Sequence, residues 1–170
     1  MRKLLGIFLT ISSLAFISSG CYTLKSTAIP LEMKTINIGF FENNAQLVVG
    51  NLSQTFTEAL KERVRSTTRL SIVSGEGNAN MTGTITGYHF EPISIQATNN
   101  NTAPIAGAQR LSITVHVKFV YDAEKKYNFE QDFTRYADYT GDITTQEQTL
   151  ILTIEKQLID DIFNKAFNNW

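Results

Sequence analysis

Apolar and polar residues alternate along several stretches of the chain, and a period of two is typical of β-strands that bury one face. The clearest stretch is residues 111–121, where the odd-numbered residues are apolar and the even-numbered residues are mainly polar. Residues 34–41 show the same period, with Ile36, Ile38 and Phe40 alternating with smaller or polar residues. We therefore predict a strand over each stretch, and a polar face on strand 111–121 that is exposed or reserved for a partner.

Three further stretches favour strands. Residues 70–73 form a short apolar run that ends at a glycine-rich break, and residues 81–96 are rich in Thr, Ile and aromatic side chains. Pro92 lacks a backbone N–H, so we expect it at an edge position or a bulge. Residues 127–139 follow a short turn at 122–126, so residues 111–139 are predicted to form a long hairpin.

Two stretches carry apolar residues at the helical period. In residues 51–66, Leu52, Phe56, Leu60 and Val64 recur every four residues. In residues 144–170 the apolar face is wider and consists of Ile151, Ile154, Leu158, Ile159, Ile162, Phe163, Ala166, Phe167 and Trp170. The predicted solvated face of this second helix is made of Glu155, Lys156, Asp160, Asp161, Asn164 and Lys165.

The starts of both helices have the spacing of a capping box, in which two side chains satisfy free backbone N–H groups. The pairs are Asn51 with Gln54 in the first helix, and Thr144 with Glu147 or Thr145 with Gln148 in the second. We therefore expect side-chain caps at both starts.

Together these elements predict an α+β fold, a two-layer sandwich in which two helices cover one face of a mixed sheet of four to five strands. The order strand, helix, strand over residues 34–73 resembles a βαβ unit with parallel strands. The polar alternation of strand 111–121 leaves the second face of the sheet uncovered. Residues 97–108, rich in Asn, Ala and Thr, are predicted to form a mobile loop.

The first 21 residues have the pattern of an export signal. Arg2 and Lys3 precede an apolar run over residues 4–17, and small residues lead to Cys21. As a helix, that run of about 14 residues would reach about 21 Å, short of the roughly 30 Å core of a membrane. We therefore expect residues 1–20 to be a cleaved signal peptide.

Cys21 is the single cysteine of the chain and directly follows the predicted cleavage site. This arrangement resembles the bacterial lipoprotein signal, which implies that Cys21 is acylated and that residues 21–33 form a lipidated tether. Several acyl chains, each contributing about 0.8 kcal/mol per buried CH₂, would hold the protein on a membrane. The alternative is an ordinary signal peptide followed by an incidental cysteine.

Removal of the signal leaves 150 of the 170 residues, enough for a single domain over residues 34–170. Arg2 and Lys3 leave with the signal, so 13 basic side chains remain against 16 acidic ones and the net charge is about −3. That balance argues against nucleic-acid binding, which needs a basic face.

The sequence contains no recognisable catalytic or metal-binding set. His89 and His116 lie in predicted strands without a Cys or a second His at usable spacing, so we interpret both as strand residues near the surface. Ser74 lacks the preceding glycine of a nucleophile elbow. Asp160 and Asp161 are adjacent on a helix and are interpreted as solvated residues rather than an acid pair. We therefore predict a protein that is not an enzyme and binds no cofactor.

Three bases lie in or beside the predicted hairpin: Arg110, Lys118 and Arg135. Basic side chains next to aromatic residues can bind phosphorylated, partly apolar ligands such as lipid headgroups. The alternative is that all three are ordinary solubilising charges.

Several segments resemble the LPS-assembly lipoprotein family LptE. They are residues 52–61 (LSQTFTEALK), 83–88 (GTITGY), 110–119, 128–138 (NFEQDFTRYAD) and 162–170 (IFNKAFNNW). The resemblance covers essentially the whole mature chain, and its specificity lies in the order of the elements together with the predicted lipid anchor.

The resemblance implies an outer-membrane lipoprotein on the periplasmic side that assembles with, and sits inside, a large LptD-like β-barrel. The pair would deliver lipopolysaccharide to the outer leaflet, with basic residues of the lipoprotein touching the glycolipid. The uncovered sheet face and the 97–108 loop suit such docking, and Asn99, Asn100, Asn101 and Pro104 are the predicted partner contacts in the loop. The alternative is a free periplasmic lipoprotein that carries a lipid or glycan in an enclosed pocket.

Overall fold

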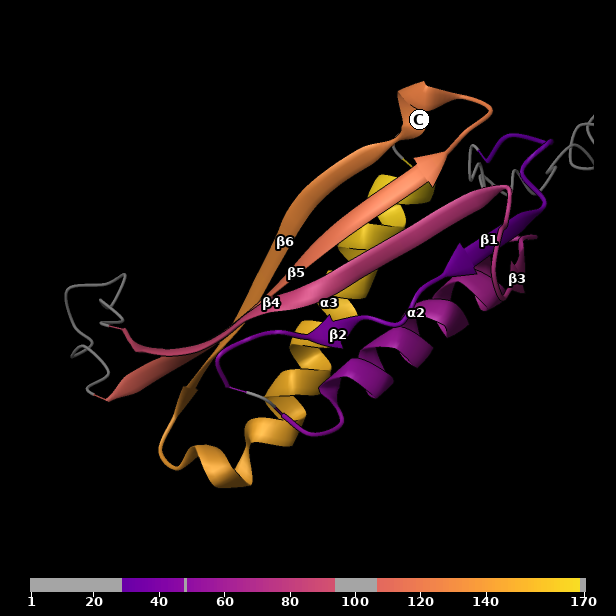
Figure 1. The fold of residues 1–170 in the computed structure, drawn as a ribbon. Helices are drawn as coiled ribbons and strands as arrows, with labels where there is room; N and C mark the ends of the chain where they lie inside the picture. Colours follow the sequence, from indigo (N-terminus) through magenta and orange to yellow (C-terminus); the bar gives the residue numbers. More distant parts are fainter. Residues whose placement is uncertain (1–28, 48, 94–106, 169–170) are drawn as a thin grey trace, which may run out of the picture.

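The computed structural model describes residues 29–47, 49–93 and 107–168. Cys21 and the predicted loop contacts Asn99, Asn100, Asn101 and Pro104 lie outside these residues. The elements, in chain order, are β1 (Thr35–Ile38), β2 (Glu42–Asn43), α2 (Leu52–Thr67), β3 (Ser71–Val73), β4 (Ala79–Pro92), β5 (Ala108–Tyr121), η1 (Lys125–Tyr127), β6 (Phe129–Thr140), η2 (Ile143–Thr145) and α3 (Glu147–Phe167). They form the predicted α+β fold (Figure 1).

The described strands form one mixed sheet in the order β3-β1-β4-β5-β6, with β2 paired to β4 beyond the end of β1. The pairs of β1 with β3, β1 with β4 and β2 with β4 are parallel. β5 is antiparallel to its two neighbours, β4 and β6, and these three are the long strands of the sheet. The first part of the chain thus forms the predicted parallel βαβ unit, and residues 111–139 form the predicted hairpin.

β2 was not predicted, because residues 42–44 are all polar and have no apolar alternation. Ile38 pairs with Met81 and Glu42 pairs with Thr84, so four steps along one strand match three along the other. This extra residue forms a bulge, which reverses the set of side chains that face the core. The prediction that Phe40 shares the apolar face of Ile36 and Ile38 is therefore wrong. Phe40 is 60% exposed, whereas Phe41 is fully buried.

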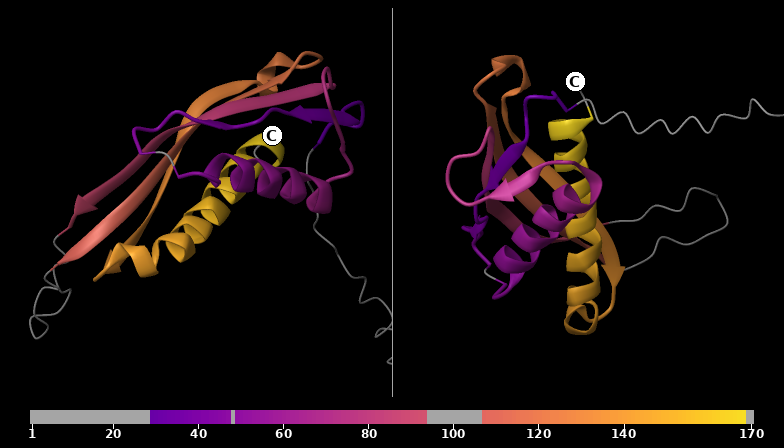
Figure 2. Two further views of the ribbon diagram at one scale, coloured as in Figure 1. Left: turned by 60° about the horizontal axis from the view of Figure 1, so that its bottom comes forward. Right: turned by 90° about the vertical axis from the view of Figure 1, so that its right-hand side faces the viewer.

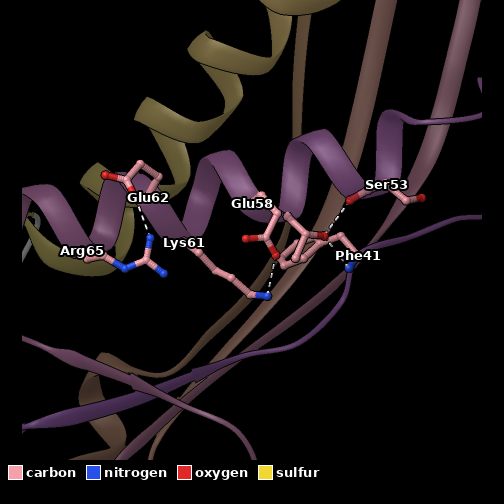
Figure 3. A network of polar contacts seen from close by, with 7 residues as sticks. Phe41, Ser53, Glu58, Lys61, Glu62 and Arg65 are labelled. Atoms are coloured by element: carbon pink, nitrogen blue, oxygen red, sulfur yellow. Dashed lines mark hydrogen bonds and ion pairs between the residues drawn. The ribbon is translucent and has the colours of Figure 1, made fainter.

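The extra residue is held by Thr57 of α2. The Phe41 N–H donates to Thr57 Oγ1 at 3.0 Å, and the Thr57 hydroxyl donates to the Ser53 carbonyl at 2.7 Å (Figure 3). The Phe41 ring lies against Gly83, where an added Cβ would come within 2.3 Å of Phe41 Cε1. A glycine in β4 therefore makes room for the ring that the bulge turns inward.

β4 also contains a bulge, between Ile85 and Gly87, where the register with β5 shifts by one residue. Pro92 is the last residue of β4 and lies opposite Gln109 of β5. Among the described strands, only β5 pairs with β4 at this end, so Pro92 occupies the predicted edge position.

Both described helices lie on one face of the sheet, and no described element covers the second face, which we call the uncovered face (Figure 2). The odd-numbered apolar residues of β5 are all buried, as predicted, together with the Leu52, Phe56, Leu60 and Val64 stripe of α2. Ile29 and Met33 also pack into this core, so the packed body already includes residues within the predicted tether. None of the described helices is long and apolar enough to cross a membrane.

The predicted capping boxes are wrong at both helices. Neither Asn51 at the start of α2 nor Gln146 at the start of α3 makes a side-chain cap bond. Residues 143–145 instead form the 3₁₀ turn η2, in which the Thr144 N–H donates to the Asp142 carboxylate at 3.0 Å. The Glu147 side chain, a predicted member of the second capping box, instead accepts a hydrogen bond from the Tyr88 hydroxyl at 2.6 Å.

Candidate functional site

The uncovered face of the hairpin carries a row of polar side chains from β5 and β6. The register places Arg110 opposite Asp138, His116 opposite Asp132 and Lys118 opposite Glu130. Since side chains alternate between the faces of a strand, all six even-numbered residues point away from the helices. Each base of this row is therefore directly opposite an acid, and we call these residues the charged row.

Arg110 is the most firmly placed base of the charged row. Its guanidinium donates to Asp138 through Nε at 2.7 Å and through a second nitrogen at 3.0 Å. The same guanidinium lies 3.6 Å from the centre of the Tyr136 ring, a side chain that is 51% exposed. The Arg110 hydrogen bonds lower the pKa of the Asp138 carboxyl. This end of the row thus combines a fixed cation with an exposed aromatic ring.

His116 bridges two carboxylates. Its Nδ1 lies 2.7 Å from Asp132 Oδ1 and its Nε2 lies 3.3 Å from Glu130 Oε1. The hydrogen bond with Asp132, followed by the one with Glu130, raises the pKa of His116. Lys118 Nζ lies 2.9 Å from the second Glu130 oxygen, and the two bases together lower the pKa of Glu130.

Arg135 lies on the other face of the sheet. It belongs to the odd-numbered set of β6 that faces the helices, and its guanidinium donates to both carboxylate oxygens of Asp161 in α3. The three bases singled out in the sequence therefore do not form one site, since only Arg110 and Lys118 share a surface. His89 is exposed on the uncovered face, opposite Ser112 of β5.

A second surface feature is an open groove of about 320 Å³ between α2 and α3 on the outer side of the helix layer. Its lining includes Arg63, Leu152 and Glu155. Glu155 was assigned to the solvated face, and that prediction is wrong because the residue is only 3% exposed. Thr55 of α2 donates to its carboxylate at 2.7 Å, while burial raises the pKa of Glu155.

Sequence reasoning missed both the carboxylate partners of the bases and the burial of Glu155. The partners could have been found by setting the two arms of the predicted hairpin in register. The position of Glu155 has no local signal, because its partner Thr55 is 100 residues away in the sequence. Among the described residues, no group of three or more His, Cys, Asp or Glu side chains is placed to hold a metal ion.

The family of this chain follows from its sequence. The model of the lipopolysaccharide-assembly family LptE matches residues 33–166, which include every described strand, all of α2 and nearly all of α3. The chain belongs to the LptE family. This is a family of non-enzymatic lipoproteins in lipopolysaccharide assembly. A search of curated proteins found no significant match for this LptE-family chain.

Solved structures share the fold of this LptE-family chain at low sequence identity. A protein of the DUF330 family from Xanthomonas campestris has a TM-score of 0.55 at 8% identity, covering 80% of this chain and 84% of that one. A homolog of neuraminyllactose-binding hemagglutinin from Helicobacter pylori has a TM-score of 0.51 at 12% identity, covering 85% and 88%. A rare lipoprotein B from Shewanella oneidensis has a TM-score of 0.44 at 11% identity, covering 78% and 90%. At identities this low the first two matches concern the fold alone, and the third, with a TM-score of 0.44, carries no argument.

Proposed function

We propose that this LptE-family protein is an outer-membrane lipoprotein, anchored through Cys21 on the periplasmic side. It assembles with and plugs an LptD-like β-barrel and helps that barrel deliver lipopolysaccharide to the outer leaflet. The observation that carries the proposal is the uncovered sheet face beside a match to the LptE family over residues 33–166. A face of this length, with polar side chains and no covering layer among the described residues, suits docking in a polar barrel interior.

Arg110 and Lys118 are the proposed lipopolysaccharide contacts. Both lie on the uncovered face, and phosphate groups are strong acceptors for guanidinium and ammonium donors. Each base already has a carboxylate partner, but solvent-exposed ion pairs contribute only about 0–1 kcal/mol. A phosphorylated ligand can therefore replace these partners at small cost.

The alternative of a free lipid carrier predicts an enclosed apolar pocket between the sheet and the helices. In the described part of the chain this space is filled by large side chains that are 0–1% exposed, among them Phe56, Tyr88, Phe119 and Phe163. Close packing of this kind leaves no room for an acyl chain. The packing therefore favours an assembly subunit over a carrier.

Co-purification tests the assembly role. Membranes that contain the tagged full-length protein are extracted in a mild detergent, and the proteins retained on the tag are quantified. We expect a large β-barrel in a ratio of about one to one with the tagged chain. A gently extracted sample that lacks any barrel would refute the assembly role.

Binding of lipopolysaccharide to the purified full-length protein tests the two contacts. We expect Arg110→Gln and Lys118→Gln each to weaken binding about three- to tenfold, the effect of roughly 0.7–1.4 kcal/mol. Arg135→Gln is the matched control, because that guanidinium lies on the helix side of the sheet and is held by Asp161. An equal loss in all three variants would mean that the charged row is not the contact.

A further inference from the structure

The outer edge of β6 is long and regular, and it has no partner among the described strands. β6 is the last strand of the sheet, and Figure 1 shows it as the outermost of the three long strands. Its 12 residues contain no proline, and its register with β5 has no shift from Phe129 to Thr140. The opposite edge strand, β3, has only 3 residues. Natural proteins usually shorten, bend or cover an edge of this kind.

The direction of the backbone groups along this edge follows from the ends of β5. The Ile93 N–H donates to the Ala108 carbonyl, so even-numbered residues of β5 bond toward β4. The Tyr121 N–H donates to Asn128 Oδ1, so odd-numbered residues of β5 point toward β6. Backbone groups alternate sides along an antiparallel strand, and odd residues of β5 pair with odd residues of β6.

The even-numbered residues of β6 therefore direct their N–H and C=O groups to the free edge. They are Glu130, Asp132, Thr134, Tyr136, Asp138 and Thr140. The Gln146 side chain donates to the Thr140 carbonyl at 2.8 Å, which closes one end of the edge and agrees with this assignment. A run from Glu130 to Asp138 is left open for pairing.

The side chains of this open run define what kind of strand fits. Its even-numbered residues, which face the uncovered side, include the acids Glu130, Asp132 and Asp138 and no base, because Arg135 faces the helices and binds Asp161. Asp132 and Glu130 meet β5 bases on one side only, and their side chains remain 64% and 51% exposed. A partner strand with basic or hydroxyl side chains on the uncovered face would complete the pairing, because opposite charges directly across two strands stabilise a sheet.

The same charges disfavour a second copy of this chain as the partner. Two-fold antiparallel pairing about Thr134 would place Glu130 of each copy opposite Asp138 of the other. In-register parallel pairing would place each acid opposite itself. Like charges directly opposite one another destabilise a strand pair.

We propose that the β6 edge from Glu130 to Asp138 accepts an extended strand of the barrel partner, which continues the sheet by β-augmentation. This inference rests on the proposed assembly with a barrel, and it adds the segment of the chain and the mode of contact. Main-chain hydrogen bonds give such a contact its affinity, and alternate side chains give it its specificity.

Residue-resolved amide hydrogen exchange tests the pairing, on the full mature lipoprotein in detergent, free and in the co-purified barrel complex. We expect the amides of Asp132, Thr134 and Tyr136 to exchange fast in the free protein and at least tenfold more slowly in the complex. The amides of Phe133 and Arg135 serve as internal controls, because they point toward β5 and are slow in both states.

Each result decides the matter. A complex that forms while the three even-numbered amides keep their free rates overturns the β6 pairing and leaves the assembly role standing. Absence of a barrel overturns both. Protection that appears in the free protein as its concentration rises identifies a second copy as the occupant, and it also overturns the proposal.

Two variants at Thr134 give an independent check. Thr134→Pro removes the outward N–H, whereas Thr134→Val keeps it, and both lose the hydroxyl contact with Thr114. We expect the proline variant to bind the barrel about two- to tenfold more weakly than the valine variant, the effect of one backbone hydrogen bond. Equal binding by the two variants, with unchanged circular dichroism, contradicts the proposal.

Discussion

Thr57 offers the sharpest test of how the sheet is built, because one buried hydroxyl joins α2 to the bulge before β2. Thr57 is 1% exposed, and its Oγ1 accepts the N–H of Phe41, a residue that is itself fully buried. Thr57→Val keeps the shape of the side chain and removes only the hydroxyl. The Phe41 N–H would then be buried without a partner, which costs about 1–3 kcal/mol.

That cost corresponds to a melting temperature lower by roughly 2–12 °C for a domain of about 150 residues. Thr57→Ser is the matched control, because it keeps the hydroxyl and loses one methyl group, worth about 0.8 kcal/mol. Urea unfolding of the wild type and both variants, followed by circular dichroism, gives the free energies of unfolding. A valine variant as stable as the serine variant would refute the reasoning, since the hydroxyl would then contribute no more than a methyl group.

Three further predictions concern single side chains. Gly83→Ala would place a Cβ 2.3 Å from Phe41 Cε1, and we expect this to lower the free energy of unfolding by about 1–3 kcal/mol. Calorimetry measures the effect, and an unchanged melting temperature would contradict the close contact. Burial raises the pKa of Glu155, so the folded protein loses stability as pH rises from the ordinary carboxyl value through the raised pKa. Glu155→Gln should remove this loss, so the variant should be more stable than the wild type at pH 8. Denaturation of both proteins at pH 4 and pH 8 measures the effect, and an equal pH dependence of the two would refute the prediction. The raised pKa of His116 means that its stabilising contribution is complete below the unfolded value of about 6.5 and disappears as pH rises through the folded pKa. Asp132→Asn should bring that pKa back toward 6.5 in an NMR titration, and an unmoved titration would rule out Asp132 as the main cause.

The sheet and its two faces follow from the sequence where one local rule decides the structure. All odd-numbered residues of strand 111–121 are buried, as the period of two predicts, because this strand lies inside the sheet with helices over one face only. The α2 stripe was predicted for the same reason, since Leu52, Phe56, Leu60 and Val64 repeat at the helical period.

The parts that sequence reasoning missed depend on contacts between distant segments. Phe41 rather than Phe40 is buried because Thr57 holds the bulge from another element. The acidic partners of Arg110 and Lys118 come from the hairpin register. Arg135 is separated from the other two bases by one step of the pleat, which places it toward Asp161. The three bases were chosen by residue type alone, and the choice therefore grouped side chains that lie on opposite faces of the sheet.

The central claim is that the uncovered sheet face, rather than the helix layer, meets the barrel. Tyr136 and Leu152 have similar exposed fractions, 51% and 53%, and lie on the sheet face and on the helix layer respectively. The full-length variants Tyr136→Cys and Leu152→Cys each add one thiol to a chain whose single native cysteine, Cys21, we expect to be acylated. Maleimide labelling of each variant, free and in the barrel complex, measures which surface becomes covered. We expect labelling at position 136 to fall at least tenfold in the complex while labelling at position 152 persists. The reverse pattern would contradict docking through the uncovered sheet face.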